Sequence, residues 1–170
     1  MAITIRNVDA PDPDTYYRIF QEALPKIGHE TARLGEDNLR RDMIRRLHSC
    51  DVCQEISLDG YVVGYIACEY LTFRGLKYKH VLHPTLGTDQ NGSRSWYYSV
   101  DYQTAWDQRN QLDGVKGFIA IHNPGSPAAK AVPIRYATST IEVLSVESVL
   151  PERTDCPTNQ RALVVTFPEN

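Results

Sequence analysis

The stretch that decides the fold class is residues 80–132, HVLHPTLGTDQNGSRSWYYSVDYQTAWDQRNQLDGVKGFIAIHNPGSPAAKAV. It begins in a strand predicted over 77–83, which ends at a His-Pro step before the polar loop PTLGTDQNG. A helix is predicted from about Ser93 to Leu112, because apolar side chains recur there at helical spacing. The residues on this stripe are Tyr98, Tyr102, Ala105 and Trp106.

The second half of the stretch predicts a buried strand and a short helix. Residues 115–122, VKGFIAIH, form a nearly all-apolar run, which is typical of a central strand covered on both faces. The segment NPGSP interrupts the run, and PAAKAV at 127–132 can start one short helix.

Elements on either side extend the same pattern. Upstream, the sequence predicts a strand over 3–7, helices over about 12–24 and 36–48, and strands over 52–58 and 61–73. The last two strands are joined by Asp59-Gly60, a strong hairpin signal. Downstream, strands are predicted over about 140–149 and 161–167. We therefore expect an α/β (α+β) fold, with one mixed, twisted sheet of about seven strands and about four helices, in a single domain over 1–170.

This order of elements resembles the GNAT-type acyl-CoA N-acyltransferases over nearly the whole chain. In that family, a strand that ends in a "V-x-P" or "H-P" step leads to a glycine-rich loop and a long helix, whose N-terminus binds the cofactor pyrophosphate. A "G-V-K" segment then introduces the central strand, and an "N-x-x-A" segment opens a short helix. The matching residues here are His83-Pro84, Gly92, Gly114-Val115-Lys116 and Asn123 with Ala128 and Ala129.

The resemblance implies acetyl-CoA, or another acyl-CoA, as the cofactor. Free N–H groups and partial positive charge make a helix N-terminus a natural phosphate site, and glycine lets the backbone approach closely. The cofactor-binding residues implied in this way are His83, Gly87, Gln90, Asn91, Gly92, Ser93, Arg94, Ser95 and Asn123. The alternative is that a serine caps the helix and Gly92 only makes the turn.

The phosphate loop departs from the family pattern "Q/R-x-x-G-x-G/A". Asp89 stands in the Gln/Arg position, where its negative charge would lie near a pyrophosphate. Arg94 stands in the second small-residue position, from which its side chain could instead bind phosphate directly. These departures indicate an altered or eroded cofactor site.

The resemblance also implies an acid and a base. Tyr136 is the candidate general acid for the leaving thiolate, and the alternative is a tyrosine that packs at a helix end. His83, His80 and His122 are candidate bases, because a histidine titrates near neutral pH, although a lone histidine is more often structural. Glu69 is an alternative base that otherwise lies on a solvent-exposed face.

Two further patterns have weaker chemical interpretations. Cys50-x-x-Cys53 beside His48 lacks a partner pair, and Cys68 and Cys156 are isolated, so we expect reduced thiols and no metal. Five arginines, Arg33, Arg40, Arg41, Arg45 and Arg46, cluster around the second helix. They could face an acidic partner or form a solvated helix face, and no nucleic acid is expected as a partner.

Composition narrows the class of protein further. The 170 residues carry 18 Lys and Arg against 21 Asp and Glu, a net charge of −3, which excludes a polycationic nucleic-acid-binding chain. No apolar run is long enough for a membrane helix, and no secretory signal is expected. We expect a cytoplasmic N-acyltransferase that acts on a small-molecule or protein amine. The alternative is a catalytically degenerate member of the fold, as in some phage proteins, which self-associates or binds other proteins within a virion.

Overall fold

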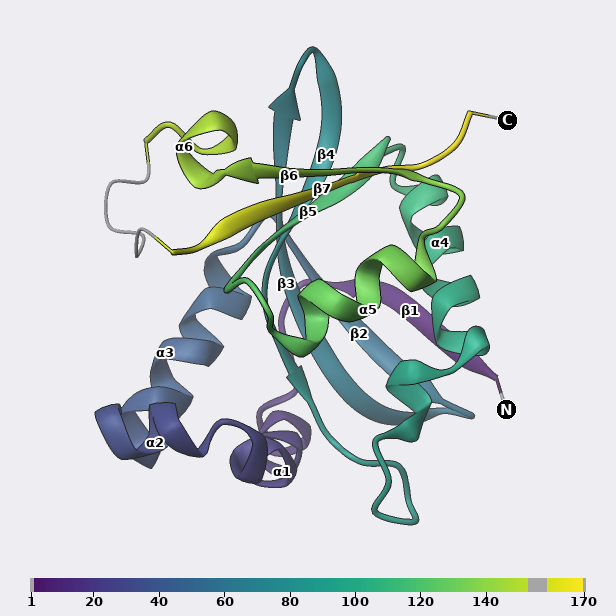
Figure 1. Ribbon diagram of the computed structural model, residues 1–170. Coiled ribbons are helices and arrows are strands. Elements are labelled where there is room, and N and C mark those ends of the chain that lie inside the picture. Colours follow the sequence, from purple (N-terminus) through teal and green to yellow (C-terminus); the bar gives the residue numbers. More distant parts are fainter. Residues whose placement is uncertain (1, 153–158, 170) are drawn as a thin grey trace. The chain divides into compact units, whose positions relative to one another are not determined.

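Seven strands pair in the order β1-β2-β3-β4-β5-β7-β6 in the computed structural model, which describes residues 2–152 and 159–169 (Figure 1). For His83 and Ala128 it describes the backbone alone. The strands are β1 (Ile3–Val8), β2 (Val52–Leu58), β3 (Tyr61–Phe73), β4 (Leu76–Leu86), β5 (Gly117–His122), β6 (Thr140–Ser145) and β7 (Arg161–Thr166). The expected mixed sheet of about seven strands is confirmed.

The described part of the chain contains more helices than the four expected. The α-helices are α1 (Pro13–Ala23), α2 (Gly28–Leu34), α3 (Glu36–Ser49), α4 (Val100–Leu112), α5 (Pro127–Arg135) and α6 (Val146–Val149). Two 3₁₀ helices, η1 (Leu24–Lys26) and η2 (Ser95–Tyr98), accompany them. None of these described helices has both the length and the apolar character that crossing a bilayer requires.

The chain forms two compact units, and each is described by itself. The first unit runs up to Glu69 and continues from His83 to Arg109. The second unit comprises Tyr70–Leu82 and the residues from Asn110 onward. Strands β3 and β4 contribute residues to both units. The single domain expected over 1–170 stays a prediction.

In the first unit, β2 pairs antiparallel with β1 and β3. The turn between β2 and β3 has φ 48° at Asp59 and 85° at Gly60, the pair of positive values that a tight hairpin needs. Helix α1 buries Tyr16, Ile19 and Phe20, and the Tyr16 ring lies 6.1 Å from that of Tyr65 on β3. The core of this unit therefore lies between α1 and the sheet, and helix α3 adds its buried stripe of Leu39, Met43 and Leu47, as predicted.

In the second unit, β5 is parallel to β4 and antiparallel to β7, which pairs with the edge strand β6. Its core contains Tyr78, Ile119, Val149, Ala162 and Val164. Phe118, which precedes Ile119 on β5, points to the other face of the sheet, since side chains alternate along a strand.

A buried ion pair ties β4 to the end of α4 within the second unit. Lys79 is fully buried, and its Nζ lies 2.8 Å from Asp113 Oδ2 and 2.7 Å from Asn110 Oδ1. Burying a charge is tolerated only when it is paired and hydrogen-bonded in this way. The pair therefore fixes where the segment leading into β5 leaves the helix.

The predicted start of the long helix was wrong. The sequence predicted a helix from Ser93, with Gly92 opening it, but α4 begins at Val100 and η2 precedes it. The reason is a cap: Ser99 Oγ accepts the N–H of Tyr102 at 3.1 Å, which starts the helix there. The aromatic residues before Ser99 continue the helical spacing of the sequence but lie in the 3₁₀ turn.

Three other boundaries differ from the predictions. Strand β4 continues through Pro84 to Leu86, and β5 begins at Gly117 rather than at Val115. The strand predicted over 140–149 ends at Ser145, where the short helix α6 begins. Helix α2 was not predicted, because its seven residues, GHETARL, carry no apolar stripe.

Candidate functional site

The loop between β4 and η2, residues 87–94, folds around the Asp89 carboxylate. Asp89 Oδ1 accepts the N–H groups of Asn91 and Ser93, each at 2.9 Å. The Asp89 backbone also accepts the Gly92 N–H at 3.0 Å and donates to Ser93 O at 2.8 Å, while Gly92 turns the chain with φ 78°. The Asp89 carboxylate therefore accepts two of the N–H groups that were predicted to bind phosphate.

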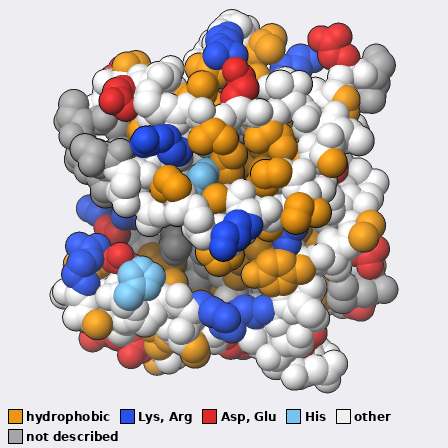
Figure 2. Space-filling model, viewed as in Figure 1, with side chains coloured by type: hydrophobic (Ala, Val, Ile, Leu, Met, Phe, Trp, Pro, Cys, Tyr) orange, Lys and Arg blue, Asp and Glu red, His pale blue; other side chains and the backbone are white. Residues whose placement is uncertain are grey.

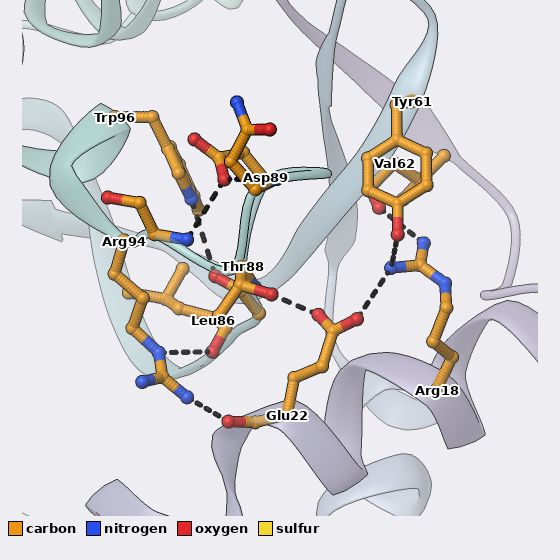
Figure 3. Close-up of polar contacts among 12 residues, drawn as sticks. Arg18, Glu22, Tyr61, Val62, Leu86, Thr88, Asp89, Arg94 and Trp96 are labelled. Atoms are coloured by element: carbon orange, nitrogen blue, oxygen red, sulfur yellow. Dashed lines mark hydrogen bonds and ion pairs between the residues drawn. The ribbon is translucent and has the colours of Figure 1, made fainter.

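A second carboxylate reaches the same loop from α1 (Figure 3). Glu22 Oε2 accepts the N–H of Thr88 at 2.8 Å, and Glu22 Oε1 accepts from Arg18 at 3.0 Å. Arg18 also donates to the Tyr61 hydroxyl and to Val62 O, so it is anchored on β3. Sequence reasoning missed Glu22. The signal available was an acidic residue in the last turn of α1, where the helix dipole favours a cation.

Arg94 points its guanidinium at backbone carbonyls. Its Nε donates to Leu86 O at 3.4 Å, and its Nη2 donates to Glu22 O (Figure 3). The Trp96 indole closes the other side of the loop, donating from Nε1 to Gly87 O at 3.3 Å. The cation that was expected near a phosphate is thus engaged by the chain itself.

Seven of the predicted cofactor-binding residues lie in one continuous segment, whereas His83 lies earlier, on β4. Gly87, Gln90, Asn91, Gly92, Ser93, Arg94 and Ser95 all belong to this one loop and the start of η2. Ser93 Oγ accepts the N–H of Ser95 at 3.1 Å, and Gly87 donates its own N–H to Val63 O at 2.7 Å. Their role in binding a cofactor stays a prediction. A diphosphate at these N–H groups would have to displace the two carboxylates.

In the second unit, His122 ends β5 with one ring nitrogen engaged. Its Nδ1 lies 3.2 Å from Asn123 O, and a carbonyl oxygen only accepts, so Nδ1 carries the proton of this hydrogen bond. Nε2 is buried and has no hydrogen-bond partner among the residues described. In the neutral ring, Nε2 is then the nitrogen with a lone pair, which is the form that a general base requires.

The turn after β5 places the short helix. Asn123 O accepts the Ser126 N–H at 3.1 Å, and Ser126 Oγ accepts the Ala129 N–H at 3.3 Å as the cap of α5. Tyr136 follows the last residue of α5 and is buried, with its ring 5.0 Å from Phe118 and 6.3 Å from Phe167. The ring of Tyr136 therefore contributes to the aromatic core, whatever its hydroxyl does.

The other three candidate bases are on β3 and β4. Glu69 is exposed on β3, and His80 is buried on β4. His83 belongs to β4, but its side chain lies outside the part that the structure describes. These three residues keep their catalytic roles as predictions only.

Cys50 and Cys53 carry protonated thiols rather than reactive thiolates. Cys50, Cys53 and Cys68 form no disulfide within the part of the chain that the structure describes. Burial raises the pKa of Cys53 to about 12 and also raises that of Cys50, so both remain protonated at neutral pH. The described residues contain no cluster of His, Cys, Asp and Glu that could hold a metal ion. Cys156 lies outside the described residues.

Four of the five arginines in the cluster around α3, all but Arg41, form ion pairs with acidic neighbours. Arg33 contacts Glu30, Arg40 lies 3.3 Å from Asp37, and Arg46 lies 3.0 Å from Asp42, which also contacts Arg45. On the face that Figure 2 draws, basic and acidic side chains are interspersed. These pairs support the interpretation of a solvated helix face, with much of its positive charge neutralised.

Comparison with known proteins identifies the fold. No protein-family model matches the sequence, and no curated protein does. Among solved structures, a GNAT-family acetyltransferase from Streptococcus agalactiae matches with TM-score 0.59 and 13% identity, over 99% of this chain and 96% of that one. An acetyltransferase from Thermus thermophilus matches with TM-score 0.57 and 17% identity, over 98% of both chains.

A third structure is an acetyltransferase of Bacillus subtilis in complex with CoA, with TM-score 0.54 and 8% identity over 98% of this chain and 99% of that one. Each match spans nearly the whole chain, so the similarity extends beyond a shared motif. The chain therefore has the GNAT-type N-acyltransferase fold.

Proposed function

We propose that this protein transfers an acyl group from an acyl thioester, acetyl-CoA or another acyl-CoA, to an amine. The observation that carries the proposal is the nearly full-length match of its fold to acetyltransferases, one of them in complex with CoA. Fold alone does not specify chemistry, so the proposal also depends on side chains suited to acyl transfer.

His122 is the proposed base. An attacking amine must be neutral, and when its nitrogen bonds to the thioester carbon it must lose a proton. Nε2 of His122 has no hydrogen-bond partner among the described residues and can take that proton, since Nδ1–H is held on Asn123 O. Tyr136 is the proposed acid, which returns a proton to the departing thiolate as the C–S bond breaks. The products are an N-acyl amide and a free thiol.

The second candidate is a binding or structural role without catalysis, as in a virion component. The loop favours it, because Asp89 and Glu22 occupy N–H groups that a cofactor phosphate would need. A cytoplasmic location accompanies the first function, and a virion location with self-association or virion partners accompanies the second.

One experiment separates these functions. The protein is incubated with acetyl-CoA and, in turn, a small-molecule amine, a peptide with a free N-terminus and a lysine peptide. The release of free thiol is measured, and the N-acetyl product is identified from its mass by mass spectrometry. We expect product with one acceptor class, and much less with Tyr136→Phe, which keeps the packed ring. If no acceptor yields product and calorimetry detects no acetyl-CoA binding, the acyltransferase proposal fails and the second function is favoured.

A further inference from the structure

We propose that Glu22 and Asp89 determine donor specificity by closing the β4–η2 loop to a diphosphate, which means that their carboxylates occupy the N–H groups that a diphosphate would need. The acyl donor would then be a thioester that the protein recognises by its pantetheine arm. A nucleotide diphosphate on the donor would not contribute to binding at this loop. The identity of the donor rests on the proposed acyl transfer, but the closure of the loop does not.

The backbone N–H groups of the loop already have acceptors within the chain. Those of Asn91 and Ser93 donate to the Asp89 carboxylate, and that of Thr88 donates to the Glu22 carboxylate. The Gly92 N–H donates to the Asp89 carbonyl. An anion binds a loop through such donors, and here the same chain already supplies the anions.

Arg18 holds the Glu22 side chain in place. Arg18 contacts its Oε1 at 3.0 Å, and Arg18 itself is stacked over the Tyr61 ring, 4.3 Å from its centre. Around Gly87 there is no spare room, because a Cβ there would lie 2.3 Å from Glu22 Oε2. The carboxylate therefore fills the space beside the loop's first residues.

The negative charges of Glu22 and Asp89 also oppose the binding of a diphosphate. A diphosphate brought to these donors would meet two carboxylates at hydrogen-bond range of the same N–H groups, and like charges repel at such distances. The cation on the loop, Arg94, donates to Leu86 O and Glu22 O. Binding of a diphosphate would have to break these contacts as well as overcome the repulsion.

The loop is tested first with inorganic pyrophosphate, which needs no catalysis. Amide resonances of the full-length protein are followed by NMR in the wild type, Asp89→Ser and Glu22→Gln. We expect no saturable shift at Asn91, Gly92 and Ser93 in the wild type, and saturable shifts there in Asp89→Ser. Serine can still accept from the loop without the charge. Asp37→Asn, an equal change of charge on α3, should behave as the wild type.

Two outcomes overturn the closure of the loop. One is saturable pyrophosphate shifts at those amides in the wild type. The other is the absence of such shifts in both loop variants. Glu22→Gln keeps the size of the side chain, so it remains informative if Asp89→Ser does not fold.

The donor is tested by comparing acetyl-CoA with S-acetylpantetheine, which lacks the nucleotide. For the wild type we expect nearly equal kcat/KM values for the two donors. In Asp89→Ser the preference for acetyl-CoA should rise about tenfold, or 1.4 kcal/mol. A wild-type preference for acetyl-CoA that both variants leave unchanged overturns the donor assignment. Failure of both donors with every amine overturns it together with the proposed function, whereas the pyrophosphate experiment still decides the loop.

Discussion

The loop after β4 and the end of β5 treat their polar groups in opposite ways. In the loop, Asp89 and Glu22 accept N–H groups that an external anion would otherwise take. At the end of β5, His122 fixes one ring nitrogen on Asn123 O and leaves the other without a partner among the described residues. The loop therefore satisfies its N–H groups with its own carboxylates, whereas the end of β5 leaves one ring nitrogen without a hydrogen bond among the described residues.

The comparison separates two roles that the proposal assigns to the chain, the binding of an anion and the acceptance of a proton. The loop residues predicted to bind phosphate and the proposed base His122 belong to different compact units. A fold can keep the chemistry of one while altering the binding of the other.

The largest effect is expected from Gly117→Ala, which would disturb the strand that carries His122. A Cβ at Gly117 would lie 1.8 Å from Val165 O, and a backbone oxygen cannot move aside without loss of the β5–β7 pairing. We expect a loss of about 4 kcal/mol or more in the free energy of unfolding, measured with urea.

Gly28→Ala is the matched control for that substitution. Gly28 is in α2 and has nothing within 4 Å of an added Cβ, so the free energy of unfolding should be unchanged or rise by less than about 1 kcal/mol. Equal stability of the two variants would show that β7 does not hold β5 tightly.

The next largest effect is on the reaction itself. With an acceptor in hand, His122→Gln should lower kcat by about 10²–10⁴-fold, because the variant has no basic lone pair. His48→Gln, at an exposed position on α3, should keep the wild-type kcat. An unchanged kcat in His122→Gln would remove the contrast between the two regions, since neither would then offer a group for catalysis.

A smaller effect should come from Gly87→Ala in the β4–η2 loop. The added methyl group would displace the Glu22 carboxylate from the Thr88 N–H, which should cost about 1–2 kcal/mol of unfolding free energy. Made in a Glu22→Ala background, the same substitution should cost clearly less, since the clashing carboxylate is gone. Additive costs in this double-mutant cycle would argue against a tight Glu22 contact.

The smallest effect is expected at a carboxylate that lacks backbone donors. Burial raises the pKa of Asp107 above its ordinary value of 3.8, while Gln103 partly offsets this. The unfolded chain therefore loses this proton first, so wild-type stability falls relative to Asp107→Asn as pH rises through 3.8.

At neutral pH, Asp107→Asn should be more stable by up to about 0.5 kcal/mol, and the difference should vanish at about pH 3. Thermal unfolding at the two pH values measures this. Asp89→Ala should have the opposite sign at neutral pH, because two N–H groups lose their acceptor. A gain in stability there would contradict the description of the loop.

Local patterns predicted much of the fold. The hairpin strands over 52–58 and 61–73 agree residue for residue with β2 and β3, because the Asp-Gly turn fixes both ends. Helix α3 agrees to within one residue, since its stripe of buried side chains is regular. The helix from Ser93 was wrong because aromatic side chains in η2 continue a helical spacing. Ser99 followed by Asp101 was the signal of the true start.

The candidate site was less predictable. Asp89 stood out from the family pattern, but its acceptance of two loop N–H groups depends on the turn at Gly92. Glu22 lies 66 positions from its partner Thr88, and no local pattern joins them. Likewise, the tautomer of His122 follows from one carbonyl in its neighbourhood, which only the folded backbone places.

The indole of Trp96 has a use beyond packing. It is buried, and it is hydrogen-bonded to Gly87 at the first turn of the loop. The chain has two tryptophans, so a Trp106→Phe variant would retain a single tryptophan, hydrogen-bonded to that loop and excited selectively over the tyrosines at the long-wavelength edge of its absorption. Its emission should shift to longer wavelength whenever the loop opens and water reaches the ring. Such a protein would report, without any added dye, which small molecules loosen the loop and how fast they do so.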